Sequence, residues 1–249
     1  MDLTHLTPLQ WIMAIIAALC IGLSKSGLVG VSMINVLLMA EVMPARESTG
    51  TVLPLLICGD VFAVLVFQKH AHWRQIGRVL PPALAGIVAG YFLMQIIPAE
   101  IFRPVIGWII LILSMLQFWR KRNPERFNHI PHTAWFAWTM GGASGVTTMM
   151  ANAAGPVMTI YLLAVSLPKM EFIGTAAWFF LIINLVKVPF SAHLGLINGH
   201  SLTLDLALVP VVAVGIWMGN RLIKVLSQEL FEAITLFFAA AVSLRFIFS

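Results

Sequence analysis

The stretch CIGLSKSGLVG at residues 20–30 places a lysine, two serines and three glycines inside an otherwise apolar run. Apolar residues continue on both sides, over residues 9–21 and 31–39. Charges and helix-breaking backbone are costly in hydrocarbon and are tolerated where protein or a water-filled cavity surrounds them. We therefore interpret residues 20–30 as a substrate-binding tip, with Lys25 as the contact for an anion.

The rest of the chain has the composition of an all-α polytopic membrane protein. Of its 249 residues, 60% are hydrophobic and 10% are charged, and apolar segments recur along the whole length. The net charge of +5 comes from Lys and Arg in short loops, which is the pattern that orients membrane proteins rather than a nucleic-acid-binding face. We expect membrane lipid and a small anion as partners, and no nucleic acid. The protein partner that the sequence allows is a second copy of the chain, in a homodimer.

Apolar runs separated by polar breaks predict two sets of helices. Each set begins with a short pair, at about 9–23 and 27–40 in the first half and about 133–150 and 155–167 in the second. Longer runs follow at 50–67, 79–97 and 102–119, and then at 174–190, 204–222 and 230–248. We expect membrane repeats over residues 1–119 and 133–249, joined by a polar cytoplasmic linker over 120–132.

An ordered series of matching residues relates the two halves. At an offset of 124, Pro44, Glu47, Gly50, Thr51 and Asp60 match Pro168, Glu171, Gly174, Thr175 and Asn184. At an offset of 129, Gly86, Gly90, Glu100 and Phe102 match Gly215, Gly219, Glu229 and Phe231. Such internal repeats are typical of secondary transporters.

The basic residues predict that the second repeat is inverted. One loop contains Lys69, Arg74 and Arg78, and the linker is also basic, so both are placed in the cytoplasm. The corresponding second-half loop, at 191–203, has no Lys or Arg, whereas the next loop contains Arg221. Opposite orientations of the two halves fit these charges and place both termini outside.

The short pairs fit re-entrant or broken helices. A helix of about 14 or 15 residues rises about 22 Å, which is less than the hydrocarbon thickness of about 30 Å. Two hairpins from opposite faces would bring residues 24–27 and 147–155 together near the midplane, where transporters build binding sites. In the alternative, each pair forms two thin spans with an aqueous loop, and Lys25 is an ordinary loop charge.

Three stretches carry a resemblance to a known family: GLSKSGLVG at 22–30, ASGVTTMMANAAGP at 143–156, and LPKMEFIGTAAWFFLIINLVKVPF at 167–190. They resemble the sulfite exporter TauE/SafE family of bacterial membrane transporters, over nearly the whole chain. The resemblance implies transport of small sulfur-containing anions, such as sulfite and organosulfonates, often as export.

The predicted substrate site is formed by both tips. A half-helix that starts at Gly27 would present free N–H groups to an oxyanion. Uncharged side chains at the second tip can donate hydrogen bonds to the same ion, or they can simply cap and join helices. The predicted substrate-binding residues are Ser24, Lys25, Ser26, Gly27, Thr147, Thr148, Asn152 and Lys187.

Two charged residues lie deep in long apolar runs. Lys187 precedes Pro189 and is interpreted as a second anion contact or as an interfacial lysine. Asp60 is interpreted as the one carboxylate well inside an apolar run, and its repeat partner is Asn184. Because burial penalises a charged carboxylate, this pair is a candidate for proton coupling. Alternatively, Asp60 is a neutral packing residue or the counter-charge of a lysine.

These features predict a secondary transporter, most simply an exporter, that moves a small sulfur oxyanion across the bacterial inner membrane by alternating access. The alternative is a passive, channel-like anion pathway without ion coupling. The sequence contains no P-loop that would couple transport to ATP. It shows no cluster of His, Cys or carboxylates inside the apolar runs, so no enzymatic activity, metal or cofactor is expected.

Overall fold

The computed structural model describes residues 6–26, 31–123, 125, 133–222, 237, 239–241 and 243–248. Within this part of the chain the regular elements are all helices. Six of them are long and apolar enough to cross a membrane. The prediction of an all-α, multi-pass membrane protein is confirmed.

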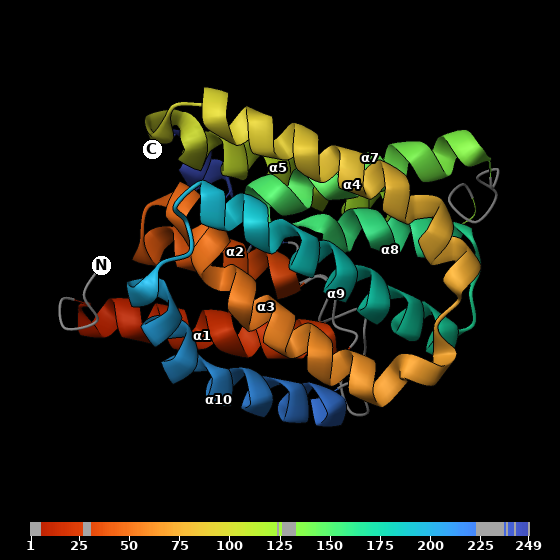
Figure 1. Ribbon diagram of the computed structural model, residues 1–249, viewed down its shortest axis with the longest axis horizontal. Helices are drawn as coiled ribbons and strands as arrows, with labels where there is room; N and C mark the ends of the chain where they lie inside the picture. Colours follow the sequence, from red (N-terminus) through yellow and green to blue (C-terminus); the bar gives the residue numbers. More distant parts are fainter. Residues whose placement is uncertain are drawn as a thin grey trace.

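The described helices fall into two sets of matching lengths (Figure 1). α1 and α7 have 18 residues each, α2 and α8 have 11 each, and α4 and α10 have 24 each. The first set comprises α1 (Pro8–Lys25), α2 (Ser32–Val42), α3 (Ala45–Phe67) with the short 3-10 helix η3 (Gln68–His70), α4 (Trp73–Ile96) and α5 (Ala99–Arg122). The second comprises α7 (Ala134–Ala151), α8 (Ala154–Ala164), α9 (Lys169–His193) and α10 (Gly199–Leu222), followed by helical residues between Ala239 and Phe248.

Local sequence explains where equivalent helices begin. Thr7 caps α1 and Thr133 caps α7, each by accepting a hydrogen bond from a backbone N–H of the first turn. Pro44 and Pro168 precede α3 and α9, and each helix has a glutamate in its first turn. These Pro-x-x-Glu segments therefore mark the starts of two equivalent helices.

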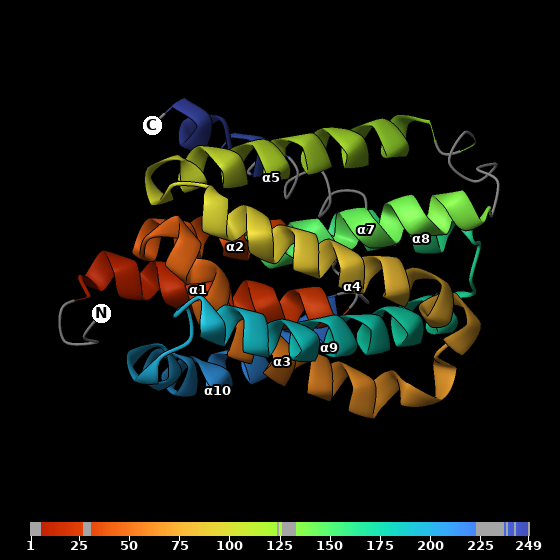
Figure 2. The same cartoon turned by 45° about the horizontal axis from the view of Figure 1, so that its top comes forward.

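The two hairpins approach the centre of the molecule from opposite ends. In Figures 1 and 2, α1 runs from one end to the middle and α2 returns, while α7 and α8 do the same from the other end. The predicted segment 133–150 agrees with α7, whereas α1, at 18 residues, is longer than the predicted 9–23. Both second arms, α2 and α8, have 11 residues and are shorter than predicted, so each rises about 16 Å. α1 continues through Lys25, which is therefore the last residue of a helix rather than part of a glycine break.

Helices of the two halves interlock through glycine. α4 packs along α7, and α10 packs along α1. A Cβ on Gly86 would overlap the backbone of α7 at Gly142, and one on Gly22 would overlap the backbone of α10 at Val212 and Gly215. Glycines therefore let these helices approach closely.

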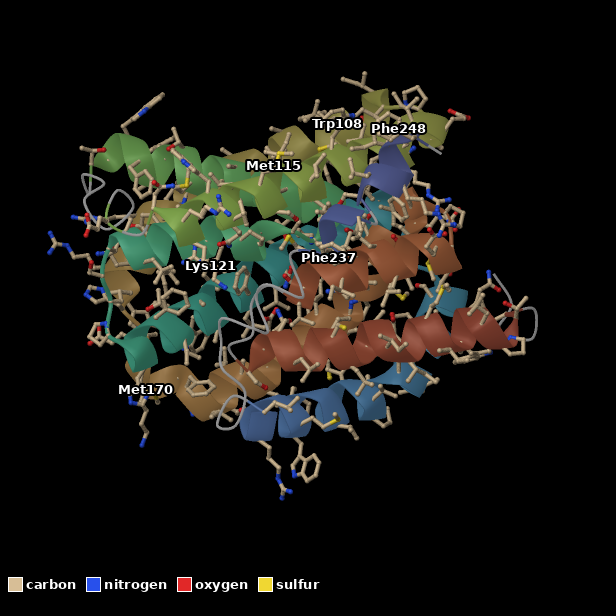
Figure 3. All side chains as sticks on the ribbon, turned by 180° about the vertical axis from the view of Figure 1, so that it is seen from behind. Trp108, Met115, Lys121, Met170, Phe237 and Phe248 are labelled. Carbon is tan, nitrogen blue, oxygen red and sulfur yellow. The ribbon has the colours of Figure 1, made fainter. Side chains whose placement is uncertain are left out.

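The outer surface of the bundle is apolar. Trp108 and Met115 of α5 are 52% and 61% exposed (Figure 3). Large exposed apolar side chains also lie on α4, α9 and α10. Such surface is unfavourable in water and natural in hydrocarbon, so lipid is the environment that this surface fits.

Candidate functional site

A cavity of about 60 Å³ lies where the two hairpin tips meet α3 and α9. This volume holds about four to six water molecules. Much of its apolar lining comes from α9, with Phe172, Ile173, Ala176 and Phe180. Its polar lining, called the polar wall below, is formed by Ser24, Lys25, Asp60, Thr148, Asn152 and Asn184. The polar residues come from α1, α3, α7 and α9, and Asn152 directly follows the last residue of α7.

Lys25 and Asp60 form a buried ion pair at this cavity. Lys25 Nζ lies 2.6 Å from Asp60 Oδ1, and the two side chains are 11% and 0% exposed. The ammonium also lies 5.2 Å from the centre of the Phe180 ring, where the face of an aromatic ring attracts a cation. The geometry corresponds to the alternative in which Asp60 is the counter-charge of a lysine.

Lys187 lies behind the polar wall and does not line the cavity. It is 1% exposed. Its Nζ donates to Thr148 Oγ1 at 3.2 Å and to Asn184 Oδ1 at 3.5 Å, and it also donates to Asn152 Oδ1. The three ammonium protons therefore have three uncharged acceptors. Lys187 adds positive charge near the cavity without an acidic partner of its own in direct contact.

The hydrogen bonds of Lys187 determine the orientation of the Asn152 and Asn184 side-chain amides. Because Lys187 donates to the oxygen of each amide, each NH₂ group faces a different acceptor. Asn184 Nδ2 donates to Asp60 Oδ2 at 2.7 Å, and Asn152 Nδ2 donates to the Thr49 carbonyl at 2.9 Å. One hydrogen-bond network therefore connects α1, α3, α7 and α9.

The N-termini of both short helices also reach the cavity. Ser32, the first residue of α2, lines it, as do Ala154 and Gly155, the first residues of α8. Neither helix start has a side-chain cap. Uncapped N–H groups give a helix start positive potential that favours an anion. The predicted start at Gly27 lies outside the described residues, and the described part of α2 begins at Ser32.

A sequence model of the sulfite exporter TauE/SafE family matches residues 14–246. The chain belongs to this family. No curated protein and no solved structure matches the chain. Membership of the TauE/SafE family agrees with a role of this protein in membrane transport.

Besides Lys187, two further predicted site residues of the TauE/SafE protein within the described residues lie away from the cavity lining. Ser26 Oγ donates to the Ile216 carbonyl at 3.0 Å, which joins α1 to α10. Thr147 Oγ1 donates to the Ala143 carbonyl at 2.8 Å, within its own helix. Over the described residues, no group of three or more His, Cys, Asp or Glu side chains is arranged to hold a metal ion.

Sequence reasoning missed a second intramembrane carboxylate. Asp205 lies on α10 and is 3% exposed, and neither carboxylate oxygen has a hydrogen-bond partner among the described residues. Asp60 stays the carboxylate in the middle of its span, whereas Asp205 lies near the start of its own. Asp205 stood at the edge of the predicted run at 204–222, whereas α10 begins at Gly199. The sequence signal for this earlier start was Asn198, a typical N-cap residue, whose side-chain oxygen accepts from the Ser201 N–H at 2.9 Å.

Proposed function

We propose that this protein is a secondary transporter that exports small sulfur-containing oxyanions, such as sulfite or an organosulfonate, across the bacterial inner membrane. The observation that carries the proposal is the central cavity, where a lysine, hydroxyls, amides and two uncapped helix starts converge. These are donors and positive potentials suited to an oxyanion. Family membership supplies the sulfur chemistry.

Lys25 is the proposed direct contact for the anion. Lysine inside a membrane costs roughly 2.5–3.5 kcal/mol on insertion scales, so a functional role is expected of it. Thr148 Oγ1 accepts from Lys187, and its hydroxyl proton is proposed to be donated to the anion. Ser24 Oγ donates to the Ile21 carbonyl and Asn152 Nδ2 to the Thr49 carbonyl. Ser24 is therefore proposed to turn toward the anion when it binds, and Asn152 to use its second amide proton. Lys187 acts from behind the polar wall, through its charge and through the amides that it orients. Ser26, Gly27 and Thr147 belong to the proposed tips and support their shape.

Asp60 and Asn184 are the proposed ion-coupling pair. They contact each other directly, and Asp60 is the charged partner of Lys25. A carboxylate so close to the anion contact can respond to the anion by changing its protonation state. This property is what separates a coupled transporter from a passive pathway.

Alternating access is proposed to arise from two inverted repeats, over residues 1–119 and 133–249, with the cytoplasmic linker between them. Three observations support this arrangement: the hairpins point inward from opposite ends, equivalent helices match in length, and matching residues recur in order. Rocking of one repeat against the other would expose the cavity to each side in turn.

Counterflow in liposomes tests the proposal. Purified protein is reconstituted into vesicles loaded with unlabelled sulfite, and uptake of labelled sulfite from the bath is followed. A transporter with alternating access accumulates the label transiently, whereas a channel equilibrates it without overshoot. Lys25→Ala is expected to abolish the overshoot, and Lys69→Ala, at an exposed lysine of η3, is the matched control. A folded Lys25→Ala protein that exchanges sulfite at the parental rate contradicts the proposed role of Lys25.

A further inference from the structure

We propose that the anion binds by displacing Asp60 from Lys25, and that Asp60 then takes up one proton, which makes the protein a proton–anion symporter. This inference rests on the proposed function and adds its coupling ion, its stoichiometry and its electrical signature. It comes from the ion pair at the cavity: within the described residues Lys25 is the only cation that lines the cavity, and Asp60 neutralises it.

The size of the cavity forces the anion against Asp60. The cavity holds only about four to six water molecules, and Asp60 lines it together with Lys25. An oxyanion that reaches the ammonium therefore lies next to the carboxylate. Two negative groups beside one ammonium, with Asp60 itself 0% exposed, repel each other.

The described surroundings of Asp60 offer no second cation to relieve this repulsion by direct contact. The charged groups that act on Asp60 are Lys25 from α1 and Lys187 from α9. Lys187 donates all three of its protons to uncharged oxygens and reaches Asp60 through Asn184.

The other helices packed against α3 contribute uncharged groups or none. α7 adds Thr148 and Asn152, and α2 adds Ser32, whereas α5 and α10 contribute no lining residue. A proton on Asp60 is the compensation that the site allows. It converts the carboxylate to a carboxylic acid and leaves Lys25 to the anion.

The order of these states determines the direction of coupling. Before the anion binds, the ion pair with Lys25 keeps Asp60 ionised in this scheme. In the occupied site Asp60 is protonated, and release of the anion on the other side returns the proton there. Anion and proton therefore move in the same direction, one for one. A monoanion moves without net charge, and export requires an internal anion concentration large enough to exceed the opposing proton gradient.

Vesicles test this with methanesulfonate, which remains a monoanion over the whole pH range used. Counterflow of methanesulfonate and sulfite is measured first. A pH gradient with an alkaline lumen is then imposed while valinomycin and potassium set the voltage. We expect about tenfold accumulation for each pH unit of gradient, and no response of this accumulation to voltage.

Two variants assign the proton to Asp60. Asp60→Asn is expected to show counterflow that no longer depends on pH and to lose accumulation driven by the pH gradient. Asp205→Asn is the matched control, because Asp205 is also a buried carboxylate in a span but does not line the cavity. It is expected to accumulate methanesulfonate like the parent.

The outcomes separate this inference from the proposed function. Parental protein that shows counterflow but accumulates methanesulfonate in response to voltage rather than to pH overturns the coupling and leaves the transport proposal intact. If neither methanesulfonate nor sulfite shows counterflow, both the coupling and the transport proposal are overturned. If Asp60→Asn does not fold, the voltage measurement on the parental protein decides the question alone.

Discussion

Asn184 donates from Nδ2 to Asp60 Oδ2 across 2.7 Å, and these two residues occupy equivalent positions in the proposed repeats. Equivalent residues that contact each other are expected where a two-fold axis passes. The cavity beside them is therefore close to the proposed axis. Its chemistry is nevertheless asymmetric, since the first half supplies a carboxylate where the second supplies an amide.

The first prediction separates the stability of the Lys25–Asp60 pair from its function. Lys25→Met leaves Asp60 buried without its cation and should destabilise the protein by about 3–5 kcal/mol. The double variant Lys25→Met/Asp60→Asn removes both charges and should recover most of this stability, yet it should not transport sulfite. Thermal unfolding in detergent and sulfite counterflow measure the two effects. A double variant as unstable as Lys25→Met would contradict the pairing.

The second prediction concerns the charge of the site. Asn184→Asp places a second carboxylate beside Asp60 and removes the hydrogen bond that Asn184 donates. Repulsion of the anion should raise the KM for sulfite at least about tenfold. Asn184→Gln, which keeps the amide, is the control and should cost less. A lower KM in Asn184→Asp would show that the anion does not bind on this wall.

The third prediction tests whether Lys187 positions the site or contacts the anion. Lys187→Met leaves the oxygens of Asn152 and Asn184 without their donor, at about 1–3 kcal/mol for each buried group. Because Lys187 does not line the cavity, the variant should lower kcat more than it raises KM. An increase in KM with an unchanged kcat would instead identify Lys187 as a direct anion contact.

The fourth prediction compares two glycines of α7. A Cβ on Gly145 would overlap Ala83 O and the backbone of Gly86, so Gly145→Ala must push α4 away from α7. The expected loss is about 1–3 kcal/mol or more. Gly142→Ala is the matched control, because the nearest heavy atom to its Cβ would be Pro82 O at 3.9 Å. Equal melting temperatures for the two variants would contradict the close packing.

The fifth prediction concerns Asp205. Since neither carboxylate oxygen has a partner, burial of this group is unfavourable. Asp205→Leu should therefore stabilise the protein by about 1–3 kcal/mol, measured by thermal unfolding. Sulfite counterflow should remain at the parental rate. A loss of counterflow in a folded Asp205→Leu protein would assign Asp205 a function.

The sequence identified most of the polar residues that meet at the cavity, but not how they pair. Lys25, Asp60 and Asn184 each stood out because charges and amides are costly inside apolar runs. Their mutual contacts depend on how α1, α3 and α9 pack, and no local pattern reports that packing. For the same reason, the sequence left open whether Asp60 is the counter-charge of a lysine and did not identify Lys25 as its partner.

Helix class and order followed from hydrophobic patterning, whereas helix ends and hydroxyl directions did not. An apolar run ends where the letters become polar, but α1 continues to Lys25 because its backbone hydrogen bonds continue. A serine or threonine in a helix can bond back to the preceding turn as readily as it can face a ligand. Thr147 does the former, and Thr148 lies at the cavity.

The interlocked packing of α4 on α7 and of α10 on α1 has a consequence for biogenesis. The ribosome releases α1 and α4 before either partner exists, so the glycine faces of both helices meet lipid first. Gly22 finds its final neighbour only after α10 has been inserted. A nascent chain that stops at the linker therefore lacks the partners of both helices. The glycine faces of α1 and α4, which α10 and α7 cover in the complete protein, then remain exposed to membrane quality control.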